Sequence, residues 1–176
     1  TIEDISTPGP VPPPPDPYVD VTVGAGEQLV LDALTTIGSL KLAAGSWAKP
    51  SIVGSFGVTN LLSLGLLPGE IASARVDGDV TIKSGAVWSV DYDTDGKAAD
   101  LLVVNGKLTV EKGATLDFGR TDANPLPRHF RAPIACATGA IDVPSKGAAD
   151  ASLAVDGMTY DATTYTVGGR HFFLAP

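Results

Sequence analysis

Two stretches decide the fold: Gly78-Asp-Val-Thr-Ile-Lys-Ser-Gly-Ala-Val-Trp-Ser-Val90 and Gly106-Lys-Leu-Thr-Val-Glu-Lys-Gly-Ala-Thr-Leu-Asp-Phe118. They align residue for residue, and in each of them apolar and polar residues alternate on both sides of a central glycine. Because residues two apart on a β-strand share a face, each stretch predicts two short strands with one apolar and one polar face, joined by a glycine turn.

A shorter unit recurs along the chain, made of two apolar residues two apart and a glycine three positions later. Its five copies are Val21/Val23/Gly26, Leu40/Leu42/Gly45, Leu64/Leu66/Gly69, Val80/Ile82/Gly85 and Leu108/Val110/Gly113. Successive glycines are 19, 24, 16 and 28 residues apart, and spacings of this size are typical of one solenoid coil. A single unit cannot bury its apolar face, whereas stacked coils can. The sequence therefore predicts an all-β fold, a β-solenoid with glycines at its corners.

An antiparallel β-sandwich is the alternative fold. Asn105-Gly106 lies between the strand-like segments at 101–104 and 107–110, and Asn-Gly is the strongest short signal for a β-hairpin. A solenoid would use the same dipeptide as a corner between two strands of one coil. The five recurring units favour the solenoid, and the direction of strand pairing around Asn105-Gly106 is left open by the sequence.

Two parts of the chain differ in composition. Seven of the 14 prolines lie between residues 8 and 17, where fixed backbone angles and missing N–H groups favour an extended conformation. We therefore expect residues 1–17 to be a proline-rich linker and residues 18–176 to be the β-solenoid domain. A capping segment is expected from about residue 120, because residues 123–130 break the strand pattern with two prolines and two basic residues.

Composition and charge narrow the classes of function. The chain has 176 residues and a net charge of -8, and an acidic surface repels nucleic-acid phosphates and anionic membranes. No stretch has the roughly 18–20 consecutive apolar residues of a membrane span. The single cysteine, Cys136, lies in an apolar run and is expected to be a small buried residue. Neither nucleic acid, nor a membrane-spanning role for this segment, nor a cofactor is expected.

One acidic cluster matches the opening of a calcium-binding loop. Asp91, Asp93 and Asp95 precede Gly96, and three carboxylates at this spacing converge on one cation when the loop curls. Position twelve of that loop is Leu102 and not the glutamate that completes the coordination sphere, and the flanking segments are strand-like. A solvated acidic corner between strands is therefore the favoured interpretation, with calcium as the alternative.

Exposed aromatic residues are candidates for sugar contact, because flat rings stack on pyranose faces. The candidates are Trp47, Tyr160 and Tyr165, and the projecting segment at 123–130 adds Arg128 and His129. Trp88 is excluded, because it aligns with Leu116 in the next copy and with Ala72 in an earlier one, which predicts a core position. No catalytic residue is assigned, because neither histidine lies in a motif that would pair it with an activated nucleophile.

The stretch from residue 78 to residue 119 resembles the C-terminal β-helical part of bacterial autotransporter passenger domains and the related autotransporter-associated β-strand repeat proteins. The features on which this resemblance rests are a strand, a polar loop ending in Asp100, the segment Leu101-Leu-Val-Val-Asn-Gly106 and a closing strand. Residues 130–141, an apolar strand followed by Thr138-Gly-Ala-Ile141, are similar to the segment that often follows. The resemblance implies a right-handed parallel β-helix, secretion, and a place at the bacterial cell surface.

The expected function is therefore a non-catalytic structural or adhesive segment of a secreted or cell-surface protein. Its partners would be glycans or proteins on a host or neighbouring cell. A glycan-binding module is the first alternative. A polysaccharide-active solenoid enzyme is the second, because β-helical glycosidases use paired carboxylates along a groove.

Overall fold

The computed structural model describes residues 18–45, 48–67, 69–92, 98–120 and 133–143, together with strands at 153–155, 158–160, 163–167 and 170–174. The expected linker, residues 1–17, lies outside the described residues. Regular secondary structure in the described part is β-strand throughout, which confirms the all-β prediction.

The strands form a ten-stranded and a seven-stranded sheet. In chain order they are β1 (Val21–Val23), β2 (Leu29–Val30), β3 (Thr35–Leu42), β4 (Ile52–Val53), β5 (Phe56–Leu64), β6 (Ser73–Asp77), β7 (Val80–Ile82), β8 (Val87–Tyr92), β9 (Leu101–Asn105), β10 (Leu108–Val110), β11 (Thr115–Arg120), β12 (Pro133–Ala137), β13 (Ile141–Asp142), β14 (Leu153–Val155), β15 (Met158–Tyr160), β16 (Thr163–Val167) and β17 (Arg170–Leu174).

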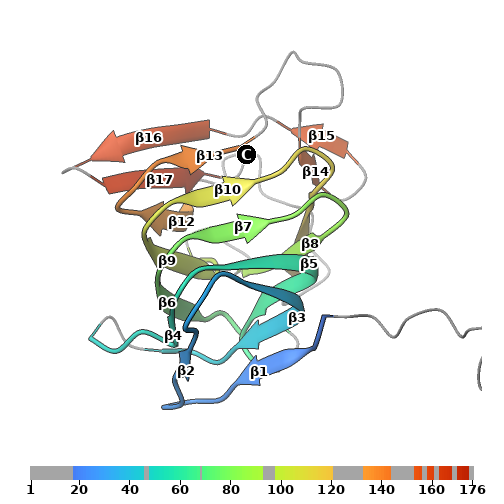
Figure 1. The fold of residues 1–176 in the computed structure, drawn as a ribbon. Coiled ribbons are helices and arrows are strands. Elements are labelled where there is room, and N and C mark those ends of the chain that lie inside the picture. The colour runs from blue at the N-terminus through green and yellow to red at the C-terminus, as the bar shows by residue number, and fades with distance from the viewer. Residues whose placement is uncertain are drawn as a thin grey trace, which may run out of the picture.

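Segments far apart in the sequence lie side by side and parallel (Figure 1). In the ten-stranded sheet Phe56 pairs with Val80 and Val80 pairs with Leu108, at offsets of 24 and 28 residues. In the seven-stranded sheet Ala74 pairs with Leu102, again 28 residues further along the chain. The parallel strands in two sheets are compatible with a parallel β-solenoid.

The antiparallel hairpin expected from the sandwich alternative is wrong for Asn105-Gly106. β9 lies between β6 and β12 in the seven-stranded sheet, while β10 lies between β7 and β13 in the ten-stranded sheet. The two strands on either side of the dipeptide thus belong to different sheets, and the dipeptide makes a corner between them.

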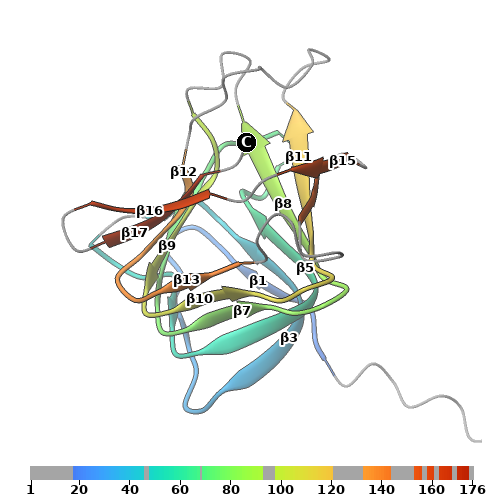
Figure 2. The ribbon, with the colours of Figure 1, turned by 90° about the horizontal axis from the view of Figure 1, so that it is seen from above.

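Seen from above, the strands lie on three sides of the interior (Figure 2). One side carries β7, β10 and β13, a second carries β8, β11 and β14, and the third is the seven-stranded sheet. The long strands β3 and β5 run along both of the first two sides, so that β5 pairs with β7 through its first half and with β8 through its second half.

Alternation along each strand places one set of side chains in the interior. Val80 and Ile82 of β7 are fully buried, while Thr81 between them is half-buried. The same pattern recurs in β8, where Trp88 stacks between Leu62 of β5 and Leu116 of β11. Burial of a side chain of this size stabilises the fold by about 1.5–3 kcal/mol. The core positions expected from the sequence are all buried: Ile82, Val90, Leu108, Val110 and Leu116.

Glycines stack at the corner between the seven-stranded sheet and the first side. A Cβ atom on Gly78 would overlap the carbonyl oxygen of Gly54, and one on Gly106 would meet the carbonyl oxygen of Gly78. Gly139 repeats this contact against Gly106 and donates a 2.8 Å hydrogen bond to its carbonyl oxygen. Successive turns of backbone therefore pack directly on one another at this corner, which a residue with a side chain would prevent.

Pairing changes direction toward the C-terminal end of the described chain. β17 pairs antiparallel with β12 and with β16, and β15 pairs antiparallel with β14. Residues 121–132, where the expected capping segment begins, lie outside the described residues.

Candidate functional site at the loop corner

The corner between the second side and the seven-stranded sheet carries the long connections. Successive strands are joined there by residues 24–28, 43–51, 65–72, 93–100 and 121–132, and we call this edge the loop corner. The corner with the stacked glycines has the shorter connections, which are residues 31–34, 54–55, 78–79, 106–107 and 138–140. The site candidates Trp47, Asp93, Asp95, Arg128 and His129 all belong to connections of the loop corner. Each of these five residues lies outside the described residues.

Asp100 is the polar group that holds this corner together. Its side chain is 2% exposed, and its Oδ1 accepts a 2.8 Å hydrogen bond from the backbone N–H of Ala72. Its Oδ2 accepts a 2.9 Å bond from the backbone N–H of Asp91, and the Asp100 N–H donates to the Asp91 carbonyl oxygen at 2.8 Å. One carboxyl thus ties the end of β8 to the start of β9 and to the residue preceding β6.

Burial raises the pKa of Asp100 to about 7. The two backbone N–H groups oppose the rise, while the neighbouring carboxylates of Asp91 and Glu70 add to it. Burial also raises the pKa of Asp91, with a hydrogen bond from the Gly69 backbone opposing it and with Asp117 and Glu70 adding to it. The loop corner therefore gathers carboxyls that are costly to ionise together.

The calcium alternative rests on residues that the structure describes only in part. Asp91 lies in β8, one residue before the end of that strand. Asp93 and Asp95 lie outside the described residues. Among the described side chains there is no group of three or more histidine, cysteine or acidic residues placed to hold a metal ion. Both oxygens of Asp100, the next acidic residue along the chain, accept backbone hydrogen bonds.

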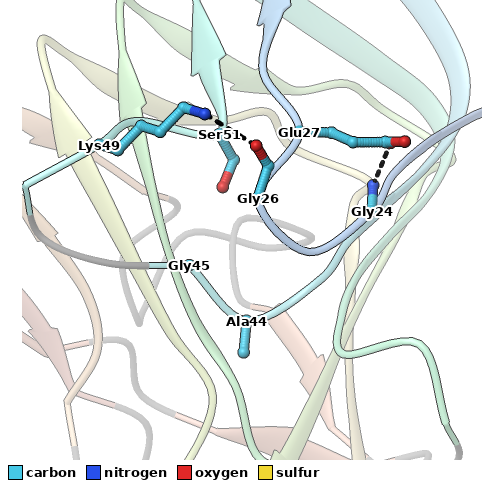
Figure 3. Close-up of a pocket in the computed structure, with 7 residues that line it drawn as sticks. All are labelled: Gly24, Gly26, Glu27, Ala44, Gly45, Lys49 and Ser51. Carbon is cyan, nitrogen blue, oxygen red and sulfur yellow. Dashed lines mark hydrogen bonds between the residues drawn. The ribbon is translucent and has the colours of Figure 1, made fainter.

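A pocket of about 270 Å³ lies at the loop corner between the first two connections (Figure 3). Its lining residues are Gly24, Gly26, Glu27, Ala44, Gly45, Lys49 and Ser51. The Lys49 ammonium donates a 2.7 Å hydrogen bond to the Gly26 carbonyl oxygen, and Glu27 Oε2 accepts one of 2.7 Å from the Gly24 N–H. The pocket thus combines an ammonium, a carboxylate and a hydroxyl with a backbone of small residues. Trp47 belongs to the same connection as Lys49, two residues before it.

The remaining aromatic candidates fall elsewhere. Tyr160 lies in β15 and Tyr165 in β16, at the antiparallel end, and their side chains are outside the described part. Trp88 is 1% exposed, so its predicted place in the core is confirmed. Its alignment with Ala72 was wrong, because Leu62 is the residue beneath it.

Sequence reasoning missed the linking role of Asp100 and the polar pocket around Lys49. The partner of Asp100, Ala72, is 28 residues away, and no local pattern reports that contact. The pocket had one sequence signal, Gly26 and Gly45 of the recurring unit, which were interpreted as corners alone.

The chain matches no family model, no curated protein and no solved structure. The resemblance to autotransporter passenger domains therefore stays a prediction. In the part of the chain that the structure describes, no helix has the length and apolar character needed to cross a membrane.

Proposed function

We propose that residues 18–176 form a right-handed parallel β-helix that serves as a non-catalytic structural or adhesive segment of a secreted or cell-surface bacterial protein. The observation that carries the proposal is the in-register stack of buried side chains. Phe56, Val80 and Leu108 lie on one another on the first side, and Leu62, Trp88 and Leu116 do so on the second.

Such a stack favours a rigid rod over a reaction centre. The buried side chains of its strands from β3 to β12 are apolar among the described residues, and its tight corner allows the backbone of neighbouring turns to pack without side chains between them. The sequence features that stand out most, the recurring apolar pairs and their glycines, are accounted for by this packing. Rigid stacking of this kind suits a spacer that holds a contact surface away from its attachment point.

Surface exposure in the organism that encodes the protein tests the proposal. Antibodies raised against the 176-residue chain should label intact cells or be found in the culture medium, and external protease should remove the label from intact cells. Recovery of the antigen only after cell lysis, in the soluble fraction, would contradict the proposed location.

The pocket around Lys49 favours a glycan-binding module as the second candidate. An ammonium, a carboxylate and a hydroxyl around a small hollow can bond sugar hydroxyls. Trp47 precedes Lys49 by two residues in the sequence, and an indole can stack on a pyranose face. On a glycan array, saturable binding that is lost in both Trp47→Ala and Lys49→Ala but kept in Lys107→Ala would support this candidate. Polysaccharide cleavage by the purified chain would instead support a solenoid enzyme and overturn the non-catalytic proposal.

A further inference from the structure

Gly106 differs from the other glycines stacked at its corner in the hydrogen bonding of its backbone N–H. The N–H groups of Gly54, Gly78 and Gly139 each donate to a backbone carbonyl oxygen, over 2.7, 3.1 and 2.8 Å. Within the described residues, the N–H of Gly106 donates no hydrogen bond. Of these four backbone nitrogens, that of Gly106 is therefore the one that no acceptor holds in place.

The residue before Gly106 carries an electrophilic carbon that is accessible to solvent. Asn105 is exposed at the end of β9, and its side-chain Oδ1 accepts a 3.0 Å hydrogen bond from the Thr138 hydroxyl. A donor on this oxygen stabilises the negative charge that develops there when a nucleophile attacks Cγ. The attacking nitrogen and the attacked carbon thus belong to consecutive residues, and glycine brings no side chain that would hinder their approach.

Two comparable positions in the described chain lack this combination. Asp77-Gly78 occupies the same corner, but both Asp77 oxygens accept hydrogen bonds from the Arg75 guanidinium, at 2.8 and 2.9 Å. The N–H of Gly78 is also bonded, as stated above. Asn60 lies within β5 and is followed by Leu61, whose side chain crowds the backbone nitrogen. The combination of a side-chain amide, a following glycine and an unbonded N–H is therefore found at Asn105 and at neither of the other two.

We propose that Asn105 is a modification site, at which the side-chain amide is lost spontaneously through attack by the Gly106 nitrogen. The nitrogen bonds to Asn105 Cγ and gives up its proton, the bond from Cγ to Nδ2 breaks, and the amide leaves as ammonia. Water then opens the resulting succinimide ring at either of its carbonyls, so that residue 105 becomes aspartate or isoaspartate. The reaction consumes one water and releases one ammonia, and nothing is oxidised or reduced. The inference is independent of the surface location and of glycan binding.

The corner limits the rate of this reaction and is weakened by its product. Ring closure turns the peptide plane between Asn105 and Gly106, whose carbonyl oxygen accepts the Gly78 N–H, so this bond has to open first. The product carboxylate belongs to a residue that pairs with Asp77 on β6, and the two negative charges repel one another. Isoaspartate also lengthens the backbone at the point where a Cβ on Gly106 would already meet the Gly78 carbonyl oxygen. The modified chain is therefore less stable than the natural one.

Peptide mass measurement on the folded 176-residue chain, incubated for several weeks at mildly alkaline pH, tests the proposal. Trypsin cuts after Lys97 and Lys107, so residues 98–107 form one peptide in which Asn105 is the only asparagine. We expect this peptide to gain the mass of deamidation and to separate into aspartate and isoaspartate forms. The rate should exceed that at Asn60 by at least about tenfold. An unchanged mass of the peptide 98–107, or equal rates at the two asparagines, would overturn the proposal.

Two further measurements test the unbonded nitrogen and the effect on the corner. Amide hydrogen exchange followed by NMR should be faster at Gly106 than at Gly78, and equal protection of the two would overturn the assignment of the nucleophile. The melting temperature of the natural chain should fall as deamidation proceeds. Asn105→Gln keeps an amide but closes a ring far less readily, so its melting temperature should stay constant over the same incubation. A fully deamidated chain that melts like the fresh one would refute the weakened corner.

Discussion

Replacing the buried carboxyl of Asp100 should remove a large part of the pH dependence of folding stability. The pKa of Asp100 is raised to about 7, against roughly 3.9 for an unfolded aspartate. The folded state therefore binds the proton more tightly than the unfolded state does. Its contribution to stability is fully present below about pH 4 and is lost as the pH rises toward 7. A difference of about 3 pKa units corresponds to about 4 kcal/mol in the free energy of unfolding.

Asp100→Asn keeps the shape of the side chain but cannot ionise. It also replaces one accepting oxygen by an NH₂ donor, so that the N–H of Ala72 or of Asp91 loses its acceptor, at a cost of about 1–3 kcal/mol. The variant should thus be less stable than the natural chain at pH 4 and at least as stable at pH 8. The neighbouring carboxyl of Asp91, whose pKa burial also raises, keeps a smaller pH dependence of the same sign in both proteins.

Urea denaturation at pH values from 4 to 8, followed by tryptophan fluorescence, measures these differences. Trp88 is 1% exposed in the folded chain, so its emission reports its transfer to water. Asp142→Asn, a matched change at an exposed residue of β13, is the control and should follow the natural profile. Stability profiles for Asp100→Asn and the natural chain that stay parallel across this range would refute the reasoning.

Three further predictions address packing and metal binding. Ile82→Ala should lower the free energy of unfolding by about 2–5 kcal/mol through lost burial and a cavity, and Thr81→Ala by less than about 1 kcal/mol; equal losses in urea titrations would contradict the assignment of faces. Gly78→Ala should lower the free energy of unfolding by about 3 kcal/mol or more, because the new Cβ would overlap the backbone of Gly54. Gly85→Ala has open space around its Cβ but keeps a φ of 85°, so it should lower the free energy of unfolding by only about 1–2 kcal/mol in the same assay. Millimolar calcium should raise the melting temperature by no more than about 1 °C, and a rise of several degrees that Asp93→Asn abolishes would show calcium binding.

The recurring unit predicted the strands better than it predicted their neighbours. Its first two copies are in register, since Val21 pairs with Leu40, and so are its last two, since Val80 pairs with Leu108. The second copy, in β3, lies on the second side of the body, whereas the fourth copy, in β7, lies on the first side. The pattern of an apolar pair followed by a glycine occurs on both of these sides, so it does not distinguish them. The third copy was placed two residues late, and its Leu66 is 42% exposed. Period alone reports which face of a strand is apolar, but not which side of the body the strand joins.

The sequence pattern did not predict the polar interactions at the loop corner. The pattern at Asp91, Asp93 and Asp95 directed attention to the acidic loop, and its interpretation as a solvated acidic corner stays a prediction, since Asp93 and Asp95 lie outside the described residues. Asp100 is deeply buried, and one of its hydrogen-bond donors is the N–H of Ala72, the residue before β6. Such contacts depend on register between segments, which local composition does not encode.

The unequal corners explain where function can vary in this fold. At the glycine corner the connections are two to four residues long and the stacked glycines pack backbone on backbone, so the spacing of the stack is set there. At the loop corner the connections range from five to twelve residues, so they change length without altering the ladders on either side. The pocket near Lys49 lies at the loop corner, where variation in the length of a connection changes the surface and leaves the apolar stack intact.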